Sequence, residues 1–196
     1  MSIRVAGVDE AGRGPLAGPV VCAAVILPEG FTHRLVRDSK ALTPSQREEA
    51  ALFLRETCVW SVKSCSVEEV DQLNILWASM EGMRRAVCGL SHAPESALID
   101  GDRIPLGLPC PAQAVVKGDA KHSCISAASI LAKTERDRMM IEAAQRYPEY
   151  GFDRHFGYAT PDHLAALAEY GPCPIHRRSF APVRDLLNQP CLMLEF

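Results

Sequence analysis

Apolar residues are grouped along this chain into short runs that predict β-strands. Ile3–Val8 and Val20–Leu27 are nearly continuous apolar runs, and the second is rich in β-branched residues. Glycines lie between these two runs, which predicts that they pair as a hairpin. Val59–Ser64 alternates apolar with polar residues, as in a strand with one buried face. Two shorter runs, Ala97–Asp100 and Gln113–Val116, complete the predicted strands.

Start signals for helices follow these strands. Thr43 stands before Pro44 and Gln46, which together form a capping box, so a helix is predicted to run to about Glu56. Strands followed by helices in this order predict an α/β sheet that is covered on both faces. The other helices are predicted over 67–87, with a break near Asn74, over 123–146, with Ser123 as its cap, and over 160–169, after Thr160-Pro161.

Length and composition are those of an ordinary globular chain. The 196 residues suit a single domain over 1–196, and 47% of them are hydrophobic. No apolar run approaches the roughly 18 residues that a membrane span needs. Asp9, Glu10 and Arg13 interrupt the first apolar stretch, which argues against a signal peptide. We therefore expect a cytoplasmic protein.

Cysteine and histidine residues do not form a recognisable metal motif. The eight cysteines include no CxxC pair, and most have apolar neighbours, so we expect reduced, buried thiols. Cys173 and His176 have a zinc-like spacing but lack a second half. The net charge of −3 argues against a protein that merely coats nucleic acid. An enzyme that holds cations on acidic residues would escape that objection, because the metal supplies positive charge.

Four acidic residues stand where predicted strands end: Asp9, Glu10, Asp100 and Asp119. Strands of an α/β sheet that deliver carboxylates to one edge could gather them into one site. Such a cluster would need cations, and oxygen ligands select hard ions such as Mg²⁺ or Mn²⁺. Two ions roughly 4 Å apart are a common device for phosphodiester cleavage. Taken singly, Asp100 and Asp119 are more typical of a turn or a helix cap than of a metal site, whereas adjacent acids after a buried strand need a compensating partner.

An ordered series of motifs resembles the ribonuclease HII family over about residues 3 to 184. The resemblance implies a ribonuclease H-like fold: a five-stranded mixed sheet flanked by helices, with a C-terminal helical extension over about 147–188. It also implies that Asp9, Glu10, Asp100 and Asp119 are the catalytic ligands of two Mn²⁺ or Mg²⁺ ions, with Asp9 as the bridging ligand. The motifs are DEAGRGPLAGPV from Asp9, DSK from Asp38, LIDG from Leu98, VKGD from Val116, ISAASILAK from Ile125, GY at Gly157 and HRRSF from His176.

The same resemblance implies how the substrate is recognised. Gly12, Arg13 and Gly14 would contact the 2′-hydroxyl at the cleavage point, since glycines allow close backbone approach. Tyr158 would stack on the deoxyribose that follows the ribonucleotide. Phe156 departs from the family, which often has lysine there, so one phosphate contact is in doubt. Without the resemblance, residues 12–14 would be interpreted as a hairpin turn with a solvated arginine, and Tyr158 as a residue that packs in the core or a loop.

Basic residues near these motifs are candidates for phosphate contacts, which would make binding dependent on salt. Arg136 and Arg138 alternate with acids and are instead expected on a solvated helix face. The expected partners are RNA–DNA hybrids and DNA that contains ribonucleotides. The phosphate candidates are Lys40, Lys121, Lys133, Arg177 and Arg178.

Three functions follow as alternatives. The first is incision on the 5′ side of a ribonucleotide, leaving a 3′-hydroxyl and a 5′-phosphate, with roles in ribonucleotide removal and primer removal. The second is another nuclease of the same fold, such as a resolvase or ribonuclease HIII. Ribonuclease HIII usually has an extra N-terminal domain, which we do not expect here because only eight residues precede Asp9. The third is a non-catalytic module, which would be expected to have lost one of the acids. Residues 189–196 loosely resemble peptides that dock on sliding clamps, and a monomer is expected.

Overall fold

A five-stranded mixed sheet forms the centre of the computed structural model, which describes residues 3–36 and 42–188. The strand order is β3-β2-β1-β4-β5. The hairpin pair β1–β2 and the pair β2–β3 are antiparallel, whereas β1–β4 and β4–β5 are parallel. The five-stranded mixed sheet expected from the sequence is therefore present. The strands are β1 Val5–Ala11, β2 Val20–Ile26, β3 Val59–Cys65, β4 Ser96–Asp100 and β5 Ala112–Val115.

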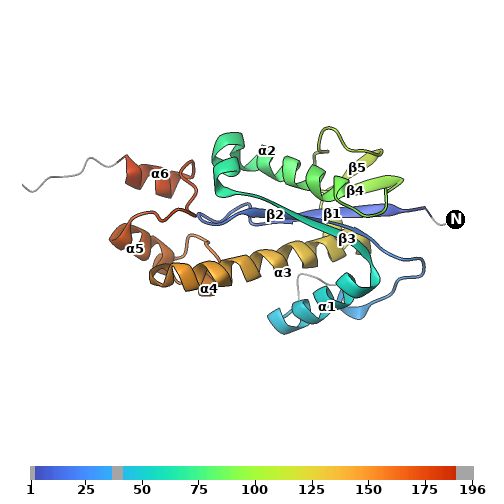
Figure 1. The fold of residues 1–196 in the computed structure, drawn as a ribbon, viewed down its shortest axis with the longest axis horizontal. Helices are drawn as coiled ribbons and strands as arrows, with labels where there is room; N and C mark the ends of the chain where they lie inside the picture. Colours follow the sequence, from blue (N-terminus) through green and yellow to red (C-terminus); the bar gives the residue numbers. More distant parts are fainter. Residues whose placement is uncertain (1–2, 37–41, 189–196) are drawn as a thin grey trace, which may run out of the picture.

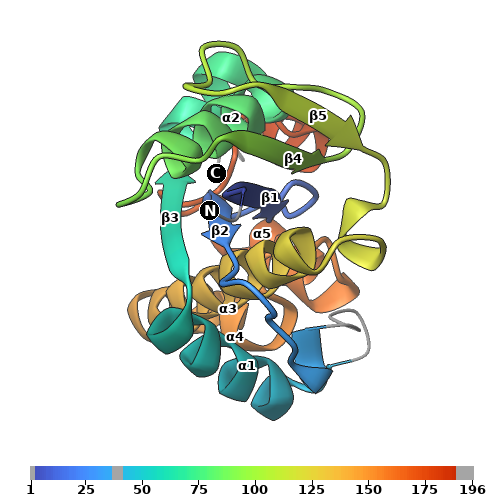
Figure 2. The ribbon, with the colours of Figure 1, turned by 90° about the vertical axis from the view of Figure 1, so that its right-hand side faces the viewer.

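Helices cover both faces of this sheet. Helix α2 (Val67–Cys88) packs on one face, and α1 (Pro44–Thr57) and α3 (Ser123–Arg146) pack on the other (Figures 1 and 2). Every residue of β2 is consequently buried. Successive side chains of a strand point to opposite faces, so Cys22 packs on the α2 side and Ala23 on the α1 and α3 side. This burial explains why β2 reads as a continuous apolar run.

Local side-chain contacts explain where the first two helices begin and break. Thr43 and Gln46 form the predicted capping box at the start of α1. Helix α2 is interrupted at Asn74, whose backbone has φ 63° and ψ 163°. The Asn74 side-chain oxygen accepts hydrogen bonds from the backbone N–H groups of Leu76 and Trp77. Asn74 therefore caps the second half of α2, which accounts for the predicted break.

Helix α3 begins where predicted but is capped differently. Ser123 is its first residue, and the N-cap position belongs to His122, whose side chain makes no capping hydrogen bond. The predicted capping role of Ser123 was wrong. The start of α3 lies directly against β1 at Gly7, where an added Cβ would come within 2.1 Å of the Cys124 backbone. Gly7 thus allows α3 to sit close beside the strand that carries Asp9 and Glu10.

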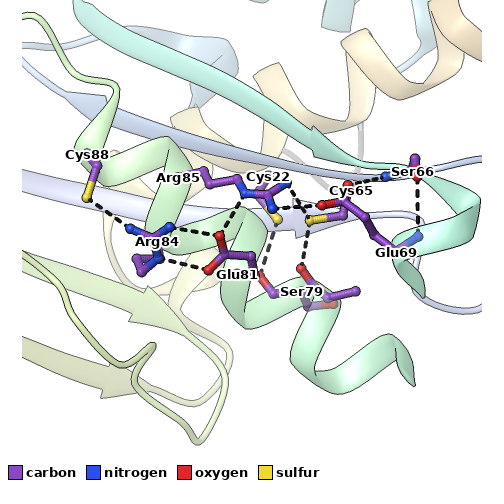
Figure 3. Close-up of polar contacts among 10 residues, drawn as sticks. Cys22, Cys65, Ser66, Glu69, Ser79, Glu81, Arg84, Arg85 and Cys88 are labelled. Carbon is purple, nitrogen blue, oxygen red and sulfur yellow. Dashed lines mark hydrogen bonds and ion pairs between the residues drawn. The ribbon is translucent and has the colours of Figure 1, made fainter. Parts of the chain in front are cut away.

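Polar contacts attach α2 to the sheet (Figure 3). Arg85, in the last turn of α2, donates hydrogen bonds to Glu81 one turn earlier at 2.8 Å and to Glu69 in the first turn at 2.7 Å, and it reaches the Cys65 sulfur of β3 at 3.7 Å. The thiols of Cys22 and Cys65 donate to backbone carbonyls of α2. All seven cysteines in the described part of the chain are free, but only Cys22 and Cys65 are buried and Cys88 is exposed, so the expectation of buried thiols was wrong for most of them.

The predicted helical extension lies at one end of the sheet (Figure 1). Its core is formed by Tyr150, Phe152 and Ala166, which pack against Met140 of α3 and Ala17 of the loop after β1. This packing connects the extension to the β1–β2 loop. Among the described residues, none of the helices has the length and apolarity needed to cross a membrane. The elements are η4 (Pro148–Tyr150), α4 (Phe152–His155), α5 (Pro161–Tyr170) and α6 (Ala181–Leu187).

Candidate active site

The predicted acids lie at the carboxyl ends of adjacent parallel strands. Val8 of β1 is in register with Ile99 of β4, so Asp9 and Asp100 follow at the same edge of the sheet. Asp119 lies in η3 (Gly118–Ala120), the short 3-10 turn after β5. A side-chain oxygen of Asp100 accepts a hydrogen bond from the backbone N–H of Gly118 at 2.7 Å. Parallel pairing and this hydrogen bond therefore bring three segments of the chain together.

Burial makes this cluster electrostatically costly. The Asp9 side chain is buried and accepts hydrogen bonds from the Ser129 side chain and the Glu10 N–H. Burial, then the charges of Glu10 and Asp100, raise the pKa of Asp9 well above its usual range. Burial, followed by the charge of Asp100, also raises the pKa of Glu10, although Arg13 opposes this shift. The three carboxylates thus repel one another in one poorly solvated region.

These residues fit a divalent cation with an open coordination shell. One carboxylate oxygen of Glu10 is buried and has no hydrogen-bond partner. Within residues 3–36 and 42–188, no three His, Cys, Asp or Glu side chains are arranged to enclose an ion by themselves. Mg²⁺ commonly binds through one or two carboxylates and keeps water or substrate phosphate as its other ligands. The cluster of carboxylate oxygens and the unpartnered Glu10 oxygen match that mode of binding.

A cavity of about 420 Å³ lies beside Glu10. Residues predicted from distant parts of the sequence line it together: Glu10, the segment 12–14, Lys133 and Tyr158. Tyr158 is 46% exposed, so one face of its ring is accessible. A Cβ added to Gly14 would lie 3.6 Å from the Tyr158 ring, which shows that the two face each other. One candidate metal ligand, Glu10, therefore lies in the same cavity as the candidate sugar-recognition residues.

The Gly12–Gly14 loop is held from behind by Arg177. This fully buried guanidinium donates hydrogen bonds to the carbonyls of Gly12 at 2.6 Å, Arg13 at 3.0 Å and Gly18 at 2.9 Å. Burial, and then the charge of Arg136, lower the pKa of Arg177 to about 9. The prediction that Arg177 contacts phosphate was wrong, because backbone carbonyls surround its side chain.

Arg136 has a similar structural role. It donates hydrogen bonds to the carbonyls of Ala17 at 3.1 Å and Phe156 at 3.0 Å, and it is 1% exposed. The prediction of a solvated Arg136 was therefore wrong, whereas Arg138 is exposed and pairs with acids of its own helix. A signal was present in the sequence, because Arg136 is four residues from both Ala132 and Met140 on the buried stripe of α3.

Lys133 and Arg47 place two cations on the cavity wall. The Lys133 ammonium lies 2.6 Å from Asp137, and the Arg47 guanidinium lies 3.2 Å from the other oxygen of that carboxylate. Lys133 also lies 4.9 Å from the centre of the Phe156 ring. Arg47 was not among the sequence candidates, because a lone arginine on the first turns of a helix carries no distinctive pattern. Asp137 fixes both cations beside the cavity.

Other predicted basic residues lie apart from the cavity. Lys121 donates to the carbonyl of Val116 at 2.7 Å, next to the turn that carries Asp119. Arg178 is exposed, and its backbone N–H donates to Asp71 at 2.9 Å. Neither residue lines the cavity. Lys40 lies outside the described residues, so its predicted phosphate contact remains a prediction.

Three histidines of the extension form a buried cluster behind Tyr158. His163 and His176 are 0% and 1% exposed, and their Nε2 atoms are 3.0 Å apart. The ring of His155 stacks on that of His163 at 4.5 Å. Among the described residues, no histidine belongs to a group of three or more His, Cys, Asp or Glu side chains that could hold a metal.

Acid should destabilise the fold through His176. Burial, and then the neighbouring His163, lower the pKa of His176 to about 4, whereas an unfolded histidine titrates near 6.5. The unfolded chain therefore binds more protons between these values, and stability is lost as pH falls through this window, by roughly 3 kcal/mol in full. Urea denaturation at pH 7 and pH 5 should show that the stability advantage of wild type over His176→Asn shrinks on acidification. A stability advantage that is the same at both pH values would contradict this assignment. Wild type is compared with His176→Asn because the raised pKa values of Asp9 and Glu10 make the fold more stable as pH falls, which would mask the effect of His176 in wild type alone.

Comparisons with known proteins identify the family of this chain. The family model described as Ribonuclease HII matches residues 6–183. The chain is 56% identical over 193 residues to the ribonuclease HII of Neisseria gonorrhoeae, covering 98% of this chain and 100% of the relative.

Solved structures of similar fold extend the comparison. The ribonuclease H2 of Pyrococcus horikoshii OT3 matches with a TM-score of 0.80 and 34% identity, covering 94% of this chain and 97% of that one. The ribonuclease HII in a PCNA:RNase HII complex from Archaeoglobus fulgidus matches with a TM-score of 0.72 and 29% identity, over 96% and 98% of the chains. Bst-RNase HIII in complex with Mn²⁺ has a TM-score of 0.74 at 20% identity, over 95% and 70% of the chains, and shows the shared fold alone. On the strength of the family match and the near-complete alignment with its members, the chain belongs to the ribonuclease HII family and is a hydrolase of the endoribonuclease class.

Proposed function

We propose that this protein cuts the RNA strand of RNA–DNA hybrids and incises DNA duplexes on the 5′ side of an embedded ribonucleotide. The products are a 3′-hydroxyl and a 5′-phosphate. The observation that carries this proposal is that Glu10, which interacts with the charges of Asp9 and Asp100, lines the same cavity as Gly12–Gly14 and Tyr158. Carboxylate oxygens that could bind metal, and residues that could recognise the sugar, would thus be within reach of the same phosphodiester group.

Four carboxylates are the proposed ligands of two Mg²⁺ or Mn²⁺ ions: Asp9, Glu10, Asp100 and Asp119. When bound, the ions would activate a water and stabilise the leaving 3′ oxygen. Support comes from the repulsion among buried carboxylates and from the unpartnered oxygen of Glu10. A related fold, Bst-RNase HIII, is known in complex with Mn²⁺. Ser129 contributes by orienting Asp9 through a side-chain hydrogen bond.

Recognition of ribose is assigned to the loop Gly12–Gly14 and to Tyr158. Gly12 has φ +97°, and a Cβ there would lie 2.0 Å from Arg136, so only glycine fits this position. Arg177 holds the carbonyls of Gly12 and Arg13, which keeps the loop in one conformation for contact with a 2′-hydroxyl. The exposed face of Tyr158 is available to stack on the next sugar. Arg13 lies 3.2 Å from Glu10, which connects recognition to the acids.

Phosphate contacts are assigned to the cations around this site. Lys133 and Arg47 stand on the cavity wall, and their shared partner Asp137 keeps them in place. Lys121, Arg178 and Lys40 remain further candidates. Because such contacts displace counterions, the affinity for duplex should fall as salt concentration rises.

Cleavage of a defined duplex tests the proposal. The substrate is a DNA duplex with one ribonucleotide, compared with an all-DNA duplex of the same sequence and with an RNA–DNA hybrid. We expect Mg²⁺- or Mn²⁺-dependent incision immediately 5′ of the ribonucleotide, cleavage of the hybrid, and no cleavage of plain DNA. Chelation of the metal should abolish both reactions.

The alternatives give different results in this assay. A resolvase would cut branched DNA without a ribonucleotide, and a non-catalytic module would bind without cutting. A ribonuclease HIII-like enzyme would cut the hybrid but leave the single-ribonucleotide duplex intact. An uncut single-ribonucleotide duplex with either metal present would therefore contradict the proposal.

Contact with a sliding clamp is a separate proposal. It is supported by the PCNA:RNase HII complex of Archaeoglobus fulgidus and by the loose resemblance of residues 189–196 to clamp-docking peptides. Those residues lie outside the described part of the chain. Retention on an immobilised clamp should fall when residues 188–196 are removed, and equal retention would end the idea. The monomeric state and the roles in primer and ribonucleotide removal likewise remain predictions.

A further inference from the structure

Buried histidines behind Tyr158 have no role in the chemistry proposed above. His163 and His176 are almost completely buried, and neither is among the residues that line the cavity beside Tyr158. Their rings nevertheless connect to the backbone of Tyr158, because His163 Nδ1 lies 2.8 Å from its carbonyl oxygen. These rings are therefore placed to affect the position of Tyr158.

Hydrogen-bond partners determine which nitrogen of each ring carries the proton. The backbone N–H of Cys173 donates to His176 Nδ1 at 3.0 Å, so His176 carries its hydrogen on Nε2. That hydrogen points at His163 Nε2, 3.0 Å away, which must then be the acceptor. His163 therefore carries its hydrogen on Nδ1 and donates it to the carbonyl of Tyr158 at 2.8 Å.

The result is a directed chain of hydrogen bonds from Cys173 to Tyr158. A second hydrogen on His163 would face the Nε2 hydrogen of His176, and a second hydrogen on His176 would face the N–H of Cys173. Only two neutral rings satisfy every partner. The chain thus has a single arrangement, and it ends on the Tyr158 backbone.

His155 supports the neighbouring residue from the other side. Its Nε2 donates to the carbonyl of Tyr150 at 2.7 Å, so its Nδ1 is free to accept from the N–H of Gly157 at 3.2 Å. The carbonyl of Gly157 accepts from the N–H of Leu16 at 2.8 Å. The backbone of Gly157 and Tyr158 is therefore held by both histidines and by the β1–β2 loop.

The segment that carries His176 also holds the other recognition element. Arg177, the next residue, donates to the carbonyls of Gly12 and Arg13. The backbone N–H of Arg177 donates to Leu16 at 2.8 Å, and His176 pairs with Ala17 in an isolated β-bridge. One segment therefore contacts the glycine loop through Arg177 and the tyrosine loop through His176 and His163.

We propose that His163 and His176 are positioning residues that hold Tyr158 at a set distance from the Gly12–Gly14 loop, and so tune recognition of the ribonucleotide junction. The inference rests on the proposed function, in which Tyr158 contacts the substrate. A displaced Tyr158 would still belong to a folded protein, but it would no longer stack on the sugar selected by the loop.

Two substitutions of His163 separate this role from mere packing. In His163→Asn the amide nitrogen lies near the former Nδ1 and can still donate to Tyr158. In His163→Gln the amide lies near the former Nε2 and leaves the Tyr158 carbonyl without its donor. We expect kcat/KM on the single-ribonucleotide duplex to fall about tenfold in His163→Gln and by about twofold or less in His163→Asn.

A double-mutant cycle with Tyr158→Ala gives the decisive readout. Without the tyrosine ring there is nothing left to position, so His163→Gln should cause no further loss beyond about twofold in that background. The same tenfold loss in both backgrounds would overturn the positioning role and assign His163 to general packing. Lack of cleavage by the wild type would instead contradict the proposed function itself. Thermal melting of each variant serves as the folding control.

A measurement on the wild type keeps the inference testable if a variant fails to fold. Long-range ¹H–¹⁵N spectra of the histidine rings at pH 7 report which nitrogen is protonated. We expect the hydrogen on Nδ1 of His163 and on Nε2 of His176, with both rings neutral. The opposite tautomers, or a charged ring, would overturn the inference.

Discussion

Asp9→Asn should reduce cleavage of a single-ribonucleotide duplex by about a thousandfold or more, because it removes one of the carboxylate charges that would hold the two metal ions. Asn keeps an oxygen that can accept the hydrogen bonds of Ser129 and the Glu10 N–H. It also removes one of the mutually repelling buried charges, which destabilise the fold in the absence of metal. The variant should therefore melt at or above the temperature of the wild type in metal-free buffer.

The control for this substitution is Asp102→Asn. Asp102 follows the same strand edge only two residues after Asp100, but its side chain is 80% exposed and its ion pair with Arg103 is long, at 4.0 Å. Its cleavage rate should stay within about twofold of wild type, since exposed pairs contribute little. Near-normal activity of Asp9→Asn, or equal losses in the two variants, would contradict the assignment of Asp9. A lower melting temperature for Asp9→Asn would contradict the electrostatic argument.

Arg177→Ala should lower the free energy of unfolding by about 3 to 5 kcal/mol. The substitution leaves the carbonyls of Gly12, Arg13 and Gly18 without their donor and opens a cavity where the guanidinium was. Arg177→Lys should recover only part of the loss, because one ammonium group cannot reproduce the planar fork of donors. Urea denaturation with a common m-value measures the effect.

The neighbouring arginine provides a matched control. Arg178 is exposed, and the hydrogen bond that it donates to Asp71 comes from its backbone N–H, which substitution of the side chain leaves intact. Arg178→Ala should therefore change the free energy of unfolding by no more than about 0.5 kcal/mol. A loss below about 1 kcal/mol for Arg177→Ala would show that the buried guanidinium does not hold the glycine loop.

Features that depend on neighbouring residues along the chain were predicted well. The capping box of Thr43 and Gln46 marked the start of α1, and the break in α2 at Asn74 was expected. Four of the five predicted strands were found within one residue of their bounds, because alternation and β-branched runs are local signals, whereas β1 extends three residues beyond its predicted end and includes Asp9 and Glu10. The capping role of Ser123 failed because a serine before a helix can equally be its first residue.

Features that depend on distant partners were not predicted correctly. Arg177 was expected to bind phosphate and Arg136 to face solvent, since charged residues are rarely buried unless they are paired. Both donate to backbone carbonyls of the loop between β1 and β2, more than 100 residues away in sequence, and Arg136 also donates to Phe156. Backbone carbonyls are present at every position, so nothing in the sequence marks which of them a buried arginine will find. Arg47 was missed for a related reason, because only the packing of α1 against α3 brings it to Asp137.

The sequence by itself determined the family, the order of strands and helices, and the acids that stand at strand ends, because motif order and hydrophobic period are written along the chain. Tertiary structure alone decided which charged groups meet. Parallel pairing of β1 with β4 brings Asp100 to Asp9, and the C-terminal extension carries Arg177 and the histidine pair to the back of the recognition loops. The physical reason is that burial and hydrogen bonding act between groups that are close in space, whatever their separation in sequence.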